Sequence, residues 1–515
     1  MQSFLQRHAS EIKGVLSGFD RIRFRGSLRQ LSYQNGMMKF LTYVSVLLKD
    51  FKDWAQSLTT QVRDSTNQLA ESAGRPVRYL YSSQVRKENV ALQIAEKDQI
   101  TEGLIAVLTC VEPCYTWHVR KDPQRKLLVL EPFSGKCLHQ YFYFLHPQLG
   151  LMHVRLQTWL PFTVHVCLNG REWLAQELLQ RKMGFEKRDN CFVDLADIAQ
   201  TQQVFDQLMQ TNWCSLLDGL LQTVHPSAAH MLGKAPPSYY WSADETEWAT
   251  DVMFHSRESL SQIYQPLVRH AITTHDTGNV LRFFGRRPHV KRLMVASVES
   301  YLGTRAEGVR VKHQLDSNSV KMYDKQGTVL RVETTINDPS ELTVQRGTEK
   351  DPQAVKLRRM RKGVADMSRR GDASQSINNR FLESLSAVTH DEPLKTTIAP
   401  LCRPTELEGR RVRALSPFQP EDARLLSAVS HSEFMLHGFR NQDLRTLLFD
   451  GDQTLTKKQQ AGKVTRLLRL LRAHKLIRKV RKSHRYQVTT NGRLQITAII
   501  AAQHAATTRL VQIAA

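Results

Sequence analysis

The sequence lacks the features that mark several common classes of protein. Only seven of its 515 residues are cysteines, an odd number scattered along the chain, so we expect reduced thiols rather than a disulfide framework. No apolar run is long enough to cross a membrane, and the opening MQSFLQRHASEIK lacks the apolar segment of a signal peptide. Neither a GxxxxGK(S/T) nor a GxGxxG motif occurs, so a nucleotide-driven motor and a dinucleotide cofactor are not expected. These absences predict a cytoplasmic protein without a membrane segment.

Acidic residues are few relative to basic ones. Seventy-two Lys and Arg stand against forty-nine Asp and Glu, which gives a formal net charge of +23 and a pI near 9.8. Such an excess repels itself unless a polyanion compensates it, so nucleic acid is the expected partner, bound more weakly at high salt. The length suggests about two to four domains, and 41% hydrophobic residues are enough to build conventional cores. No feature of the sequence indicates an oligomeric state.

The imbalance is greatest between residues 457 and 485, where twelve Lys or Arg occur without one Asp or Glu. Apolar residues within this stretch recur at i, i+3, i+4 and i+7, which predicts a helix with one buried stripe. The stripe consists of Val464, Leu467, Leu468 and Leu471. The residues that follow predict two short strands joined by a basic tip at 481–485, and then a turn into a last helix.

The segment VTRLLRLLRAHKLIRKV, followed by a basic tip and VTTNGR, resembles the recognition helix, wing and closing turn of MarR-type winged-helix regulators. The resemblance implies a winged-helix DNA-binding domain over residues 416–515. Earlier helices are expected at 420–430 and 440–449, the second one capped by Asn441. Cations of the helix and the wing are the expected contacts to duplex DNA. These are Lys463, Arg466, Arg469, Lys482 and Arg485.

The remaining chain predicts an α+β fold, with a mainly antiparallel sheet core and flanking helices. Residues 1–100 have mostly helical apolar spacing and one basic strand. Residues 101–345 form an α+β core, in which two sheet-forming blocks enclose a helical insert. Residues 346–415 form a basic linker, with KLRRMRKG as an exposed helix or extended segment that tracks phosphates.

The early strand DRIRFRGSL places three arginines on one face. They are Arg21, Arg23 and Arg25. Either they line a phosphate-binding surface or they form the solvated side of an edge strand. Asp20 just before them is either the start of an acidic nuclease site or a turn residue.

The first sheet-forming block, residues 104–179, gathers histidines, an arginine and aromatics on one face. They are His139, Tyr141, Tyr143, His153, Arg155 and His165. Three interpretations are open: a divalent metal held by His153 and His165, a platform for unpaired bases with Arg155 on phosphate, or a face covered by helices. Cysteines and a histidine in the same block form either a zinc site or buried free thiols, since their spacing is not that of a standard knuckle. They are Cys110, Cys114, Cys137 and His139.

Two carboxylates in the insert stand four residues apart, in the segment SYYWSADETEWATD. On a predicted helix, Glu247 and Asp251 share one face, where they either share a metal ion or are solvated. Trp248 between them is expected to pack inward.

The second sheet-forming block, residues 308–338, predicts three antiparallel strands that display a tyrosine, carboxylates and cations together. Its polar face carries Arg310, Lys312, Lys321, Tyr323, Arg331 and Glu333. This grouping suits phosphodiester chemistry: a tyrosyl oxygen attacks phosphorus, a metal held by Glu333 and Asp324 polarises the phosphate, and cations offset the developing charge. The cations proposed for that role are Lys321, Lys325 and Arg331. Alternatively, Tyr323 and Glu333 are a cross-strand pair that supports a binding surface.

The order NSVKMYDK, turn, LRVE resembles the central strands of rolling-circle replication initiators of the plasmid Rep and filamentous-phage types. The resemblance implies DNA nicking with a tyrosine and a divalent metal, Mg²⁺ or Mn²⁺. It implies Tyr323, Glu333, Asp324 and Lys325 as catalytic residues. The metal ligands are then drawn from Glu333, Asp324, His153 and His165, although the tight His-hydrophobe-His pair of related nickases is absent. The order of blocks along the chain also resembles a group of long bacterial proteins without an assigned role, which implies no chemistry.

We therefore expect a nucleic-acid-binding protein of a mobile or replicating element, with metal-dependent DNA nicking or strand transfer as its enzymatic interpretation. Duplex DNA would bind the winged helix, and single-stranded DNA or RNA the core. The alternative is a non-catalytic RNA- or DNA-binding protein, such as a ribonucleoprotein component or a transcriptional regulator, which needs no cofactor.

Overall fold

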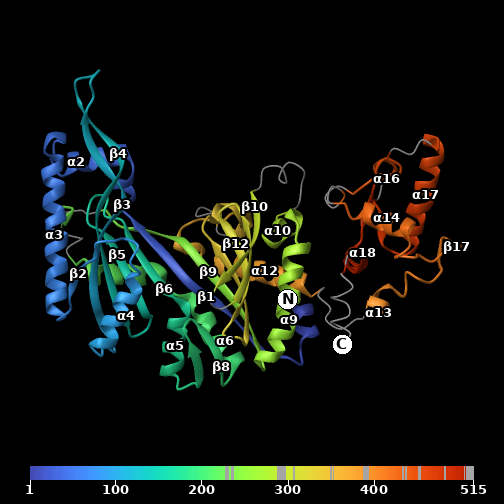
Figure 1. Ribbon diagram of the computed structural model, residues 1–515. Helices are drawn as coiled ribbons and strands as arrows, with labels where there is room; N and C mark the ends of the chain where they lie inside the picture. The colour runs from blue at the N-terminus through green and yellow to red at the C-terminus, as the bar shows by residue number, and fades with distance from the viewer. Residues whose placement is uncertain are drawn as a thin grey trace. The chain divides into compact units, whose positions relative to one another are not determined.

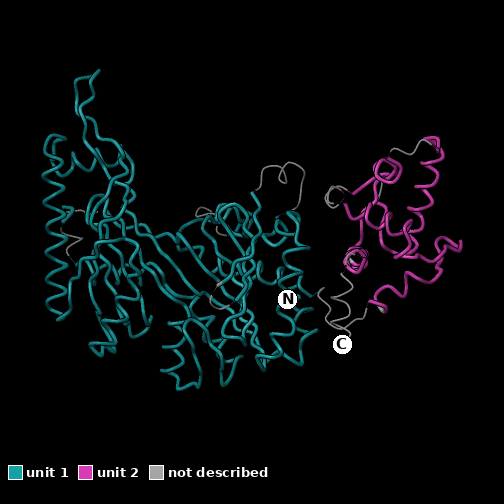
Figure 2. The backbone as a smooth tube through the Cα atoms, viewed as in Figure 1, with its two compact units in different colours: residues 1–386 teal, residues 387–515 magenta. Residues whose placement is uncertain are grey.

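The computed structural model describes most of the chain in two compact units, residues 1–386 and 387–515 (Figure 2). The described residues are 1–226, 231–233, 237–286, 297–305, 308–347, 351, 353–386, 394–431, 434, 438–450, 454–480, 483–503 and 505. Lys482, a predicted DNA contact, lies outside them. Helices and a large sheet are both present, which confirms the predicted α+β class.

Among the described residues, eleven strands of the first unit form one sheet, in the order β10-β11-β12-β13-β9-β1-β6-β5-β4-β3-β2 (Figure 1). The strands are β1 Ile12–Ser27, β2 Val77–Tyr79, β3 Gly103–Lys121, β4 Leu128–His146, β5 Gly150–Gln157, β6 Val164–Asn169, β9 Tyr240–Phe254, β10 Val298–Arg305, β11 Gly308–Leu315, β12 Asn318–Lys325 and β13 Val329–Ile336. Neighbours run antiparallel, except that β2 pairs with β3 in parallel. The two predicted sheet-forming blocks are therefore the two halves of a single sheet.

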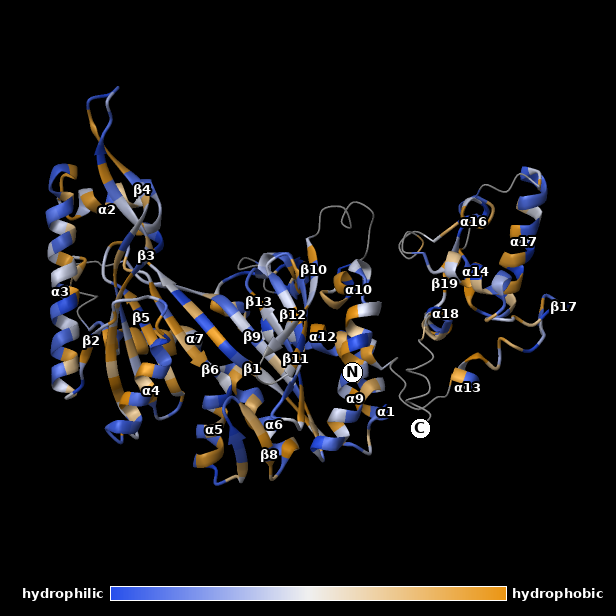
Figure 3. Cartoon of the chain, viewed as in Figure 1, coloured by the Kyte–Doolittle hydropathy of each residue, from blue (hydrophilic) through white to orange (hydrophobic). Residues whose placement is uncertain are grey.

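Strand β1 joins these halves, because it pairs with β6 on one side and β9 on the other. It is sixteen residues long and so extends well before the predicted segment DRIRFRGSL. Hydrophilic and hydrophobic residues alternate along it (Figure 3). Ile22 and Phe24 are buried in the main core, and Arg21 and Arg23 are exposed on the other face. Arg21, Arg23 and Arg25 thus lie on a central strand, not on an edge.

Helices cover both faces of the sheet. The helices of the first unit are α1 Gln2–Arg7, α2 Gln34–Tyr43, α3 Phe51–Ser72, α4 Lys87–Lys97, α5 Gly170–Gln180, α6 Ile198–Asp206, α7 Trp213–Val224, α9 Arg257–Thr274, α10 Thr277–Phe283 and α12 Met367–Leu385. On one face α3 contacts β3 and α12 contacts β9 and β13, whereas α4 packs on the opposite face at β3 and β4. No helix among the described residues is long and apolar enough to cross a membrane.

Helix α5 follows β6 without a loop and packs against β1. Asn169, the last residue of β6, caps it by accepting the backbone N–H groups of Arg171 and Glu172. A Cβ at Gly170 would lie 2.1 Å from the backbone oxygen of Phe19, so only glycine permits this close approach. Beyond α5, the hairpin of β7 (Phe185–Arg188) and β8 (Cys191–Leu195) carries Asn190 in its turn.

The predicted helical insert is correct for α6, α7, α9 and α10 but wrong at residues 240–254, which form β9, the strand between β1 and β13. Both faces of β9 are buried over most of its length, so its apolar residues do not show the alternation of a half-exposed strand. Glu247 and Asp251 are therefore about 13 Å apart along a strand, not one helical turn apart. Trp248 packs inward as predicted, at 5% exposure.

The stretch around KLRRMRKG belongs to the first unit and is not a linker, although Lys356 and Arg359 are exposed as predicted. It forms β15 (Lys356–Arg359), which pairs with β14 (Thr343–Arg346), and it leads into α12 of the first unit. Arg370 is buried at 1% exposure and donates to the carbonyl of Ala243 at 2.8 Å. The many basic residues of this stretch made α12 difficult to predict, although its other face is apolar, with Ile377 and Phe381 in the core.

In its described residues the second unit begins with a short helix and a hairpin, α13 and β16–β17, and continues with three helices, a second hairpin and a last helix in the order expected from the sequence. Its elements are α13 Leu394–Ile398, β16 Thr405–Leu407, β17 Arg410–Val412, α14 Pro420–Val429, α16 Asn441–Leu448, α17 Lys457–Ala473, β18 Ile477–Lys479, β19 Tyr486–Val488 and α18 Thr490–Gln503. The predicted stripe of α17 is buried at Val464, Leu468 and Leu471, with Leu467 half-buried. Asn441 is the first residue of α16 rather than its cap, and its amide donates to Ala461 and Thr465 of α17.

Candidate functional site

Three neighbouring strands of the first unit bring three carboxylates together. Asp20 lies on β1, Glu247 on β9 and Glu333 on β13, and one oxygen of each lies within 4.8 Å of the others. Neighbouring strands are about 4.8 Å apart, so side chains at matching positions on one face meet in this way. We call these three residues the acid cluster. It is the one group of three or more potential metal ligands within the described part of the chain.

A β-bulge in β1 places Asp20 in the acid cluster. Phe19 pairs with Trp248 and Ile22 with Thr246, so Asp20 and Arg21 together stand opposite Glu247. Such a bulge redirects side chains without moving the flanking residues out of the core. Phe19 and Ile22 accordingly remain buried at 1% exposure. As a result, Arg21 contacts Glu245 of β9, and Asp20 contacts Arg331 of β13.

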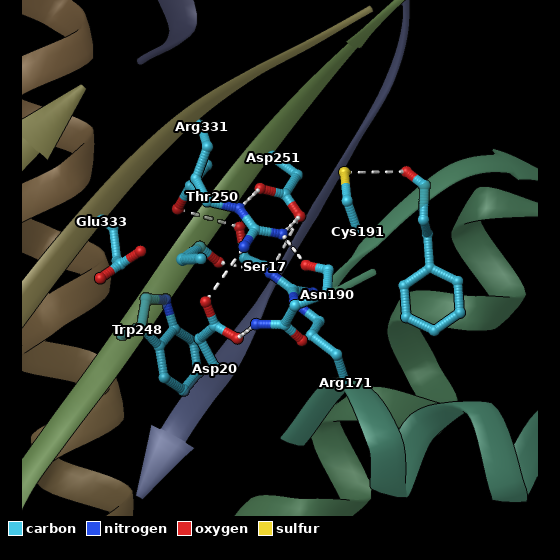
Figure 4. Close-up of polar contacts among 12 residues, drawn as sticks. Ser17, Asp20, Arg171, Asn190, Cys191, Trp248, Thr250, Asp251, Arg331 and Glu333 are labelled. Atoms are coloured by element: carbon cyan, nitrogen blue, oxygen red, sulfur yellow. Dashed lines mark hydrogen bonds and ion pairs between the residues drawn. The ribbon is translucent and has the colours of Figure 1, made fainter. Parts of the chain in front are cut away.

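Arg331 on β13 ties Asp20 to a second, deeper carboxylate (Figure 4). Its guanidinium lies 3.0 Å from Asp20 and 2.6 and 2.8 Å from the two oxygens of Asp251, and it also donates to the carbonyl of Asn190. Arg171 of α5 adds an ion pair to Asp251 at 3.1 Å. Burial alone would raise the pKa of Asp251, but the charges of Arg331 and Arg171 outweigh it and hold that pKa below its ordinary value.

The turn between β7 and β8 supports Asp20 from the side of α5. The amide of Asn190 donates to Asp20, and Asn169 in turn donates to the amide oxygen of Asn190 at 2.9 Å. Asp20 is therefore held by a cation and an amide, at 3% exposure. This side chain is fixed before any ligand binds.

Lys321 and Tyr323 of β12 contact the cluster from the next strand. Lys321 Nζ lies 2.5 Å from one oxygen of Glu333 and 3.3 Å from Glu247. The Tyr323 hydroxyl donates to the other oxygen of Glu333 at 2.7 Å. Burial, followed by the charge of Glu333, raises the pKa of Tyr323 well above its ordinary value, so its proton is firmly held. Burial opposes the charge of Lys321, but Glu333 and Glu247 outweigh it and raise its pKa.

The cluster is open to solvent on the side of β1. Arg21 is 56% exposed and contacts Glu245 at 2.6 Å and Glu247 at 3.2 Å. Arg23 is 45% exposed and lies 3.6 Å from Glu245. The side chain of Glu247 is 14% exposed, whereas those of Asp20 and Glu333 are nearly inaccessible. A phosphate approaching this opening would meet Arg21 and Arg23 first.

The donor set of the acid cluster suits a hard divalent cation. Carboxylate oxygens are the ligands that Mg²⁺ and Mn²⁺ prefer. Ligands of one octahedral Mg²⁺ are about 3.0 Å apart when adjacent and about 4.2 Å apart when opposite, so the three carboxylates must move closer together to hold one ion. The Glu333 oxygen that faces Lys321 is buried and paired with that ammonium, so a metal bound there would displace Lys321.

Two residues predicted to act with Glu333 lie elsewhere. Asp324 is on the opposite face of β12 from Tyr323, and its carboxylate accepts the N–H of Gly327 in the following turn. It is therefore not a ligand of a metal at Glu333. Lys325 lies at the end of β12, four residues and about 13 Å from Lys321. Both predictions relied on closeness along the sequence. In the structure, the alternation and the length of β12 keep these two side chains away from Glu333.

The predicted histidine ligands are also remote from Glu333. His165 is on β6, and β9 and β1 lie between β6 and β13, so these strands are about 14 Å apart across the sheet. The two residues are further apart than that, because His165 pairs with Arg25 of β1 whereas Glu333 is level with Gly18. His165 contacts Asp244 at 3.5 Å, and His153 packs on the ring of Tyr143 at 4.8 Å. Burial, followed by the charge of Arg155, lowers the pKa of His153 to about 4. These histidines do not join Glu333 in one metal site.

The aromatic face of β4 is covered by α4. Tyr141 and Tyr143 are 9% and 4% exposed and form a core with Ala91 and Ala95. Of the three interpretations of this face, coverage by a helix is correct. Arg155 pairs with Glu112 at 3.1 Å rather than lying free for phosphate. All seven cysteines fall within the described residues and are free thiols, as predicted.

The other predicted nucleic-acid contacts differ in accessibility. Arg331 is 1% exposed and engaged by two carboxylates, so the prediction that it contacts phosphate is wrong. Lys312 is half-buried and donates to Gln314 at 3.0 Å. In the second unit, Lys463 and Arg466 are exposed on α17, and Arg469 and Arg485 are half-buried.

Sequence reasoning noticed Asp20, Glu247 and Glu333 separately but did not join them. Glu245, Glu247 and Asp251 stand at even spacing and so share one strand face, but the apolar residues of β9 show no matching alternation that would have placed Glu247 on a strand. No family model, no curated protein and no solved structure shows a significant match to the chain.

Proposed function

We propose that this protein is a nucleic-acid-binding protein of a mobile or replicating element, and that its acid cluster holds a Mg²⁺ or Mn²⁺ ion for phosphodiester cleavage. The observation that carries the proposal is the meeting of Asp20, Glu247 and Glu333 within 4.8 Å beside the exposed Arg21 and Arg23. When bound, the metal would polarise the phosphate. The seven free thiols and the charge of +23 support a cytoplasmic location and a polyanionic substrate.

The residues around the cluster have distinct roles in this proposal. Asp20, Glu247 and Glu333 hold the metal, while Arg21 and Arg23 orient the incoming phosphates. Lys321 offsets charge on the phosphorane, because its ammonium already lies between Glu247 and Glu333. Arg331 is a positioning residue that holds Asp20 and has no contact with the substrate.

Two nucleophiles are compatible with the arrangement, water and Tyr323. In the tyrosine route, the hydroxyl proton passes to Glu333, an oxygen–phosphorus bond forms, and the bond from phosphorus to the leaving strand breaks. The strand then remains covalently attached, as strand transfer requires. The raised pKa of Tyr323 works against this route and favours water. A Tyr323→Phe variant separates the two: it abolishes a protein–DNA adduct but leaves hydrolysis by water.

For the second unit we propose a winged-helix domain that binds duplex DNA. The order of α14, α16, α17, the β18–β19 hairpin and α18 supports it. On α17, Lys463 and Arg466 are exposed while Val464 and Leu468 face the core, so the cationic side is available to a phosphate backbone.

The proposed activity is tested by incubating the full chain with supercoiled and with labelled single-stranded DNA, plus Mg²⁺ or Mn²⁺. We expect nicking that EDTA stops and that Asp20→Asn, Glu247→Gln and Glu333→Gln each reduce by at least about a hundredfold, the size of effect that loss of one electrostatic contact in a catalytic site produces. Glu71→Gln, at an exposed position of α3, is the matched control and should cleave normally. Cleavage that persists in all three cluster variants would refute the assignment.

A non-catalytic RNA- or DNA-binding protein is the second candidate, and one observation favours it. Each carboxylate of the cluster already has a cation: Asp20 has Arg331, Glu247 has Arg21, and Glu333 has Lys321. The cluster is therefore neutralised without a metal and could serve as a structural network. Nucleic-acid binding that is unaffected by divalent ions, with no cleavage of DNA or RNA, would support this candidate.

A further inference from the structure

The hairpin of β3 and β4 extends far beyond the sheet to which it belongs (Figure 1). The two strands pair from Gly103 with Leu145 as far as Lys121 with Leu128. However, β2 reaches only to Thr109 of β3, and β5 pairs only with residues 139–146 of β4. Within the described residues, 111–121 and 128–138 therefore form a two-stranded ribbon about 34 Å long, at 3.4 Å per residue. We call residues 111–138 the ribbon.

The ribbon is anchored to the body of the first unit as far along its length as the pair Val119–Leu130. Trp117 is 3% exposed, and its indole N–H donates to the carbonyl of Leu31 at 2.8 Å. Leu130 is 1% exposed, and its carbonyl accepts from the amide of Gln34 at 2.7 Å. The ribbon therefore has a fixed direction, and its tip, residues 120–129, is mostly exposed beyond these anchors.

The tip carries cations and exposed apolar side chains. Between residues 119 and 129, four basic residues accompany one acid, Asp122, which accepts the N–H groups of Gln124 and Arg125 within the turn. The basic residues are Arg120, Lys121, Arg125 and Lys126. Leu127 at the tip is 63% exposed and Leu128 is 41% exposed. Further down, Phe133 is 51% exposed.

We propose that the ribbon is an interaction surface for duplex nucleic acid, with its tip in the major groove. The major groove admits a two-stranded ribbon, and apolar side chains in a groove contact thymine methyl groups or wedge between base steps. Lys121, Arg125 and Lys126 then contact the phosphates on either side, and Leu127 and Leu128 contact the bases. Charge complementarity favours this occupant over a second copy of the chain, which carries the same net charge of +23. The inference rests on the proposed function only in taking nucleic acid as the partner.

The test uses the full chain carrying Lys463→Ala and Arg466→Ala, so that the exposed cations of α17 do not conceal the ribbon's contribution. Into this background are placed Lys121→Ala, Arg125→Ala and Lys126→Ala together, and binding to a 30-base-pair duplex is measured in EDTA at several salt concentrations. We expect the Kd to rise at least about tenfold, and the slope of log K against log salt to fall by about 2 to 3, because three phosphate contacts are lost. Binding in EDTA involves no cleavage.

The matched control removes three exposed cations from residues 49–63, outside the ribbon: Lys49→Ala, Lys52→Ala and Arg63→Ala. Equal losses in the two triple variants would reduce the effect to net charge and overturn the inference, as would unchanged binding in the ribbon variant. Loss of a dimer in the ribbon variant, measured by light scattering, would assign the ribbon to a contact between copies and also overturn it. Failure of the proposed cleavage is recognised separately, since Glu333→Gln abolishes cleavage but leaves this binding unchanged.

Discussion

Replacing Arg331 by methionine should destabilise the first unit far more than replacing an exposed arginine of the same face. Arg331 is 1% exposed and satisfies both Asp20 and Asp251, of which Asp251 is also 1% exposed. Methionine fills a similar volume but leaves two buried carboxylates short of a cation. Removing one partner of a buried ion pair costs about 3–5 kcal/mol. Arg171 still contacts Asp251, so we expect the lower end of that range.

Urea unfolding followed by tryptophan fluorescence measures this loss in the first unit alone, because all seven tryptophans precede residue 387. Arg23→Met is the control: its single ion pair to Glu245 is long and half-exposed, so it should cost about 0–1 kcal/mol. The folded state lowers the pKa of Asp251, so the stability this carboxylate contributes is present above its unfolded pKa and is lost as pH falls. The difference between wild type and Arg331→Met should therefore shrink below about pH 4. Equal, small losses in both variants at pH 7 would refute the positioning role of Arg331.

Three further predictions concern stability. Burial lowers the pKa of four histidines to about 4, below their value in the unfolded chain: His139, His153, His225 and His313. The free energy of unfolding should therefore fall as the pH drops from about 6.5 toward 4. In urea titrations, His225→Gln should make this pH dependence less steep. Gly170→Ala should destabilise the first unit by about 1–3 kcal/mol, because its Cβ would meet the backbone of β1. Gly219→Ala, in the open middle of α7, should instead stabilise it by about 0.5–1 kcal/mol. Equal effects of the two substitutions in thermal unfolding would contradict the close approach at Gly170. Leu468→Ala should lower the free energy of unfolding of the second unit by about 2–5 kcal/mol in calorimetry. It should leave the unfolding transition monitored by tryptophan fluorescence unchanged. A shift of that transition would show that the two units do not unfold independently.

Local periodicity was sufficient to predict elements whose two faces differ. The stripe of α17 and the strands β11 and β12 have one buried and one more exposed, polar face, so the sequence shows the correct period. Strand β13 is buried on both faces, but its polar and apolar residues still alternate. The period is lost in β9, whose faces are both buried as well, and in α12, where basic residues flank an apolar stripe. In those segments tertiary burial, not local pattern, determines the structure.

The candidate site depends on pairing between distant segments, which no local pattern records. Asp20 and Glu333 are more than three hundred residues apart in the chain, and β9 must lie between their strands for them to meet. A bulge of one residue in β1 then decides whether Asp20 faces the cluster. Sequence reasoning paired Glu333 with Asp324 because the two are close in the chain, yet they lie on opposite faces of the sheet. It did associate Tyr323, Lys321 and Glu333 correctly, since these lie on adjacent strands of one hairpin.

The most direct test of the metal site is anomalous diffraction from crystals of the full chain soaked in Mn²⁺. The account predicts one strong peak bounded by Asp20, Glu247 and Glu333, with Lys321 moved away from Glu333, and no peak there in Asp20→Asn crystals grown and soaked in the same way. A wild-type map without density at the cluster, in which Lys321 and Arg331 still pair with the carboxylates, would contradict the account and leave the cluster as an internal ion-pair network.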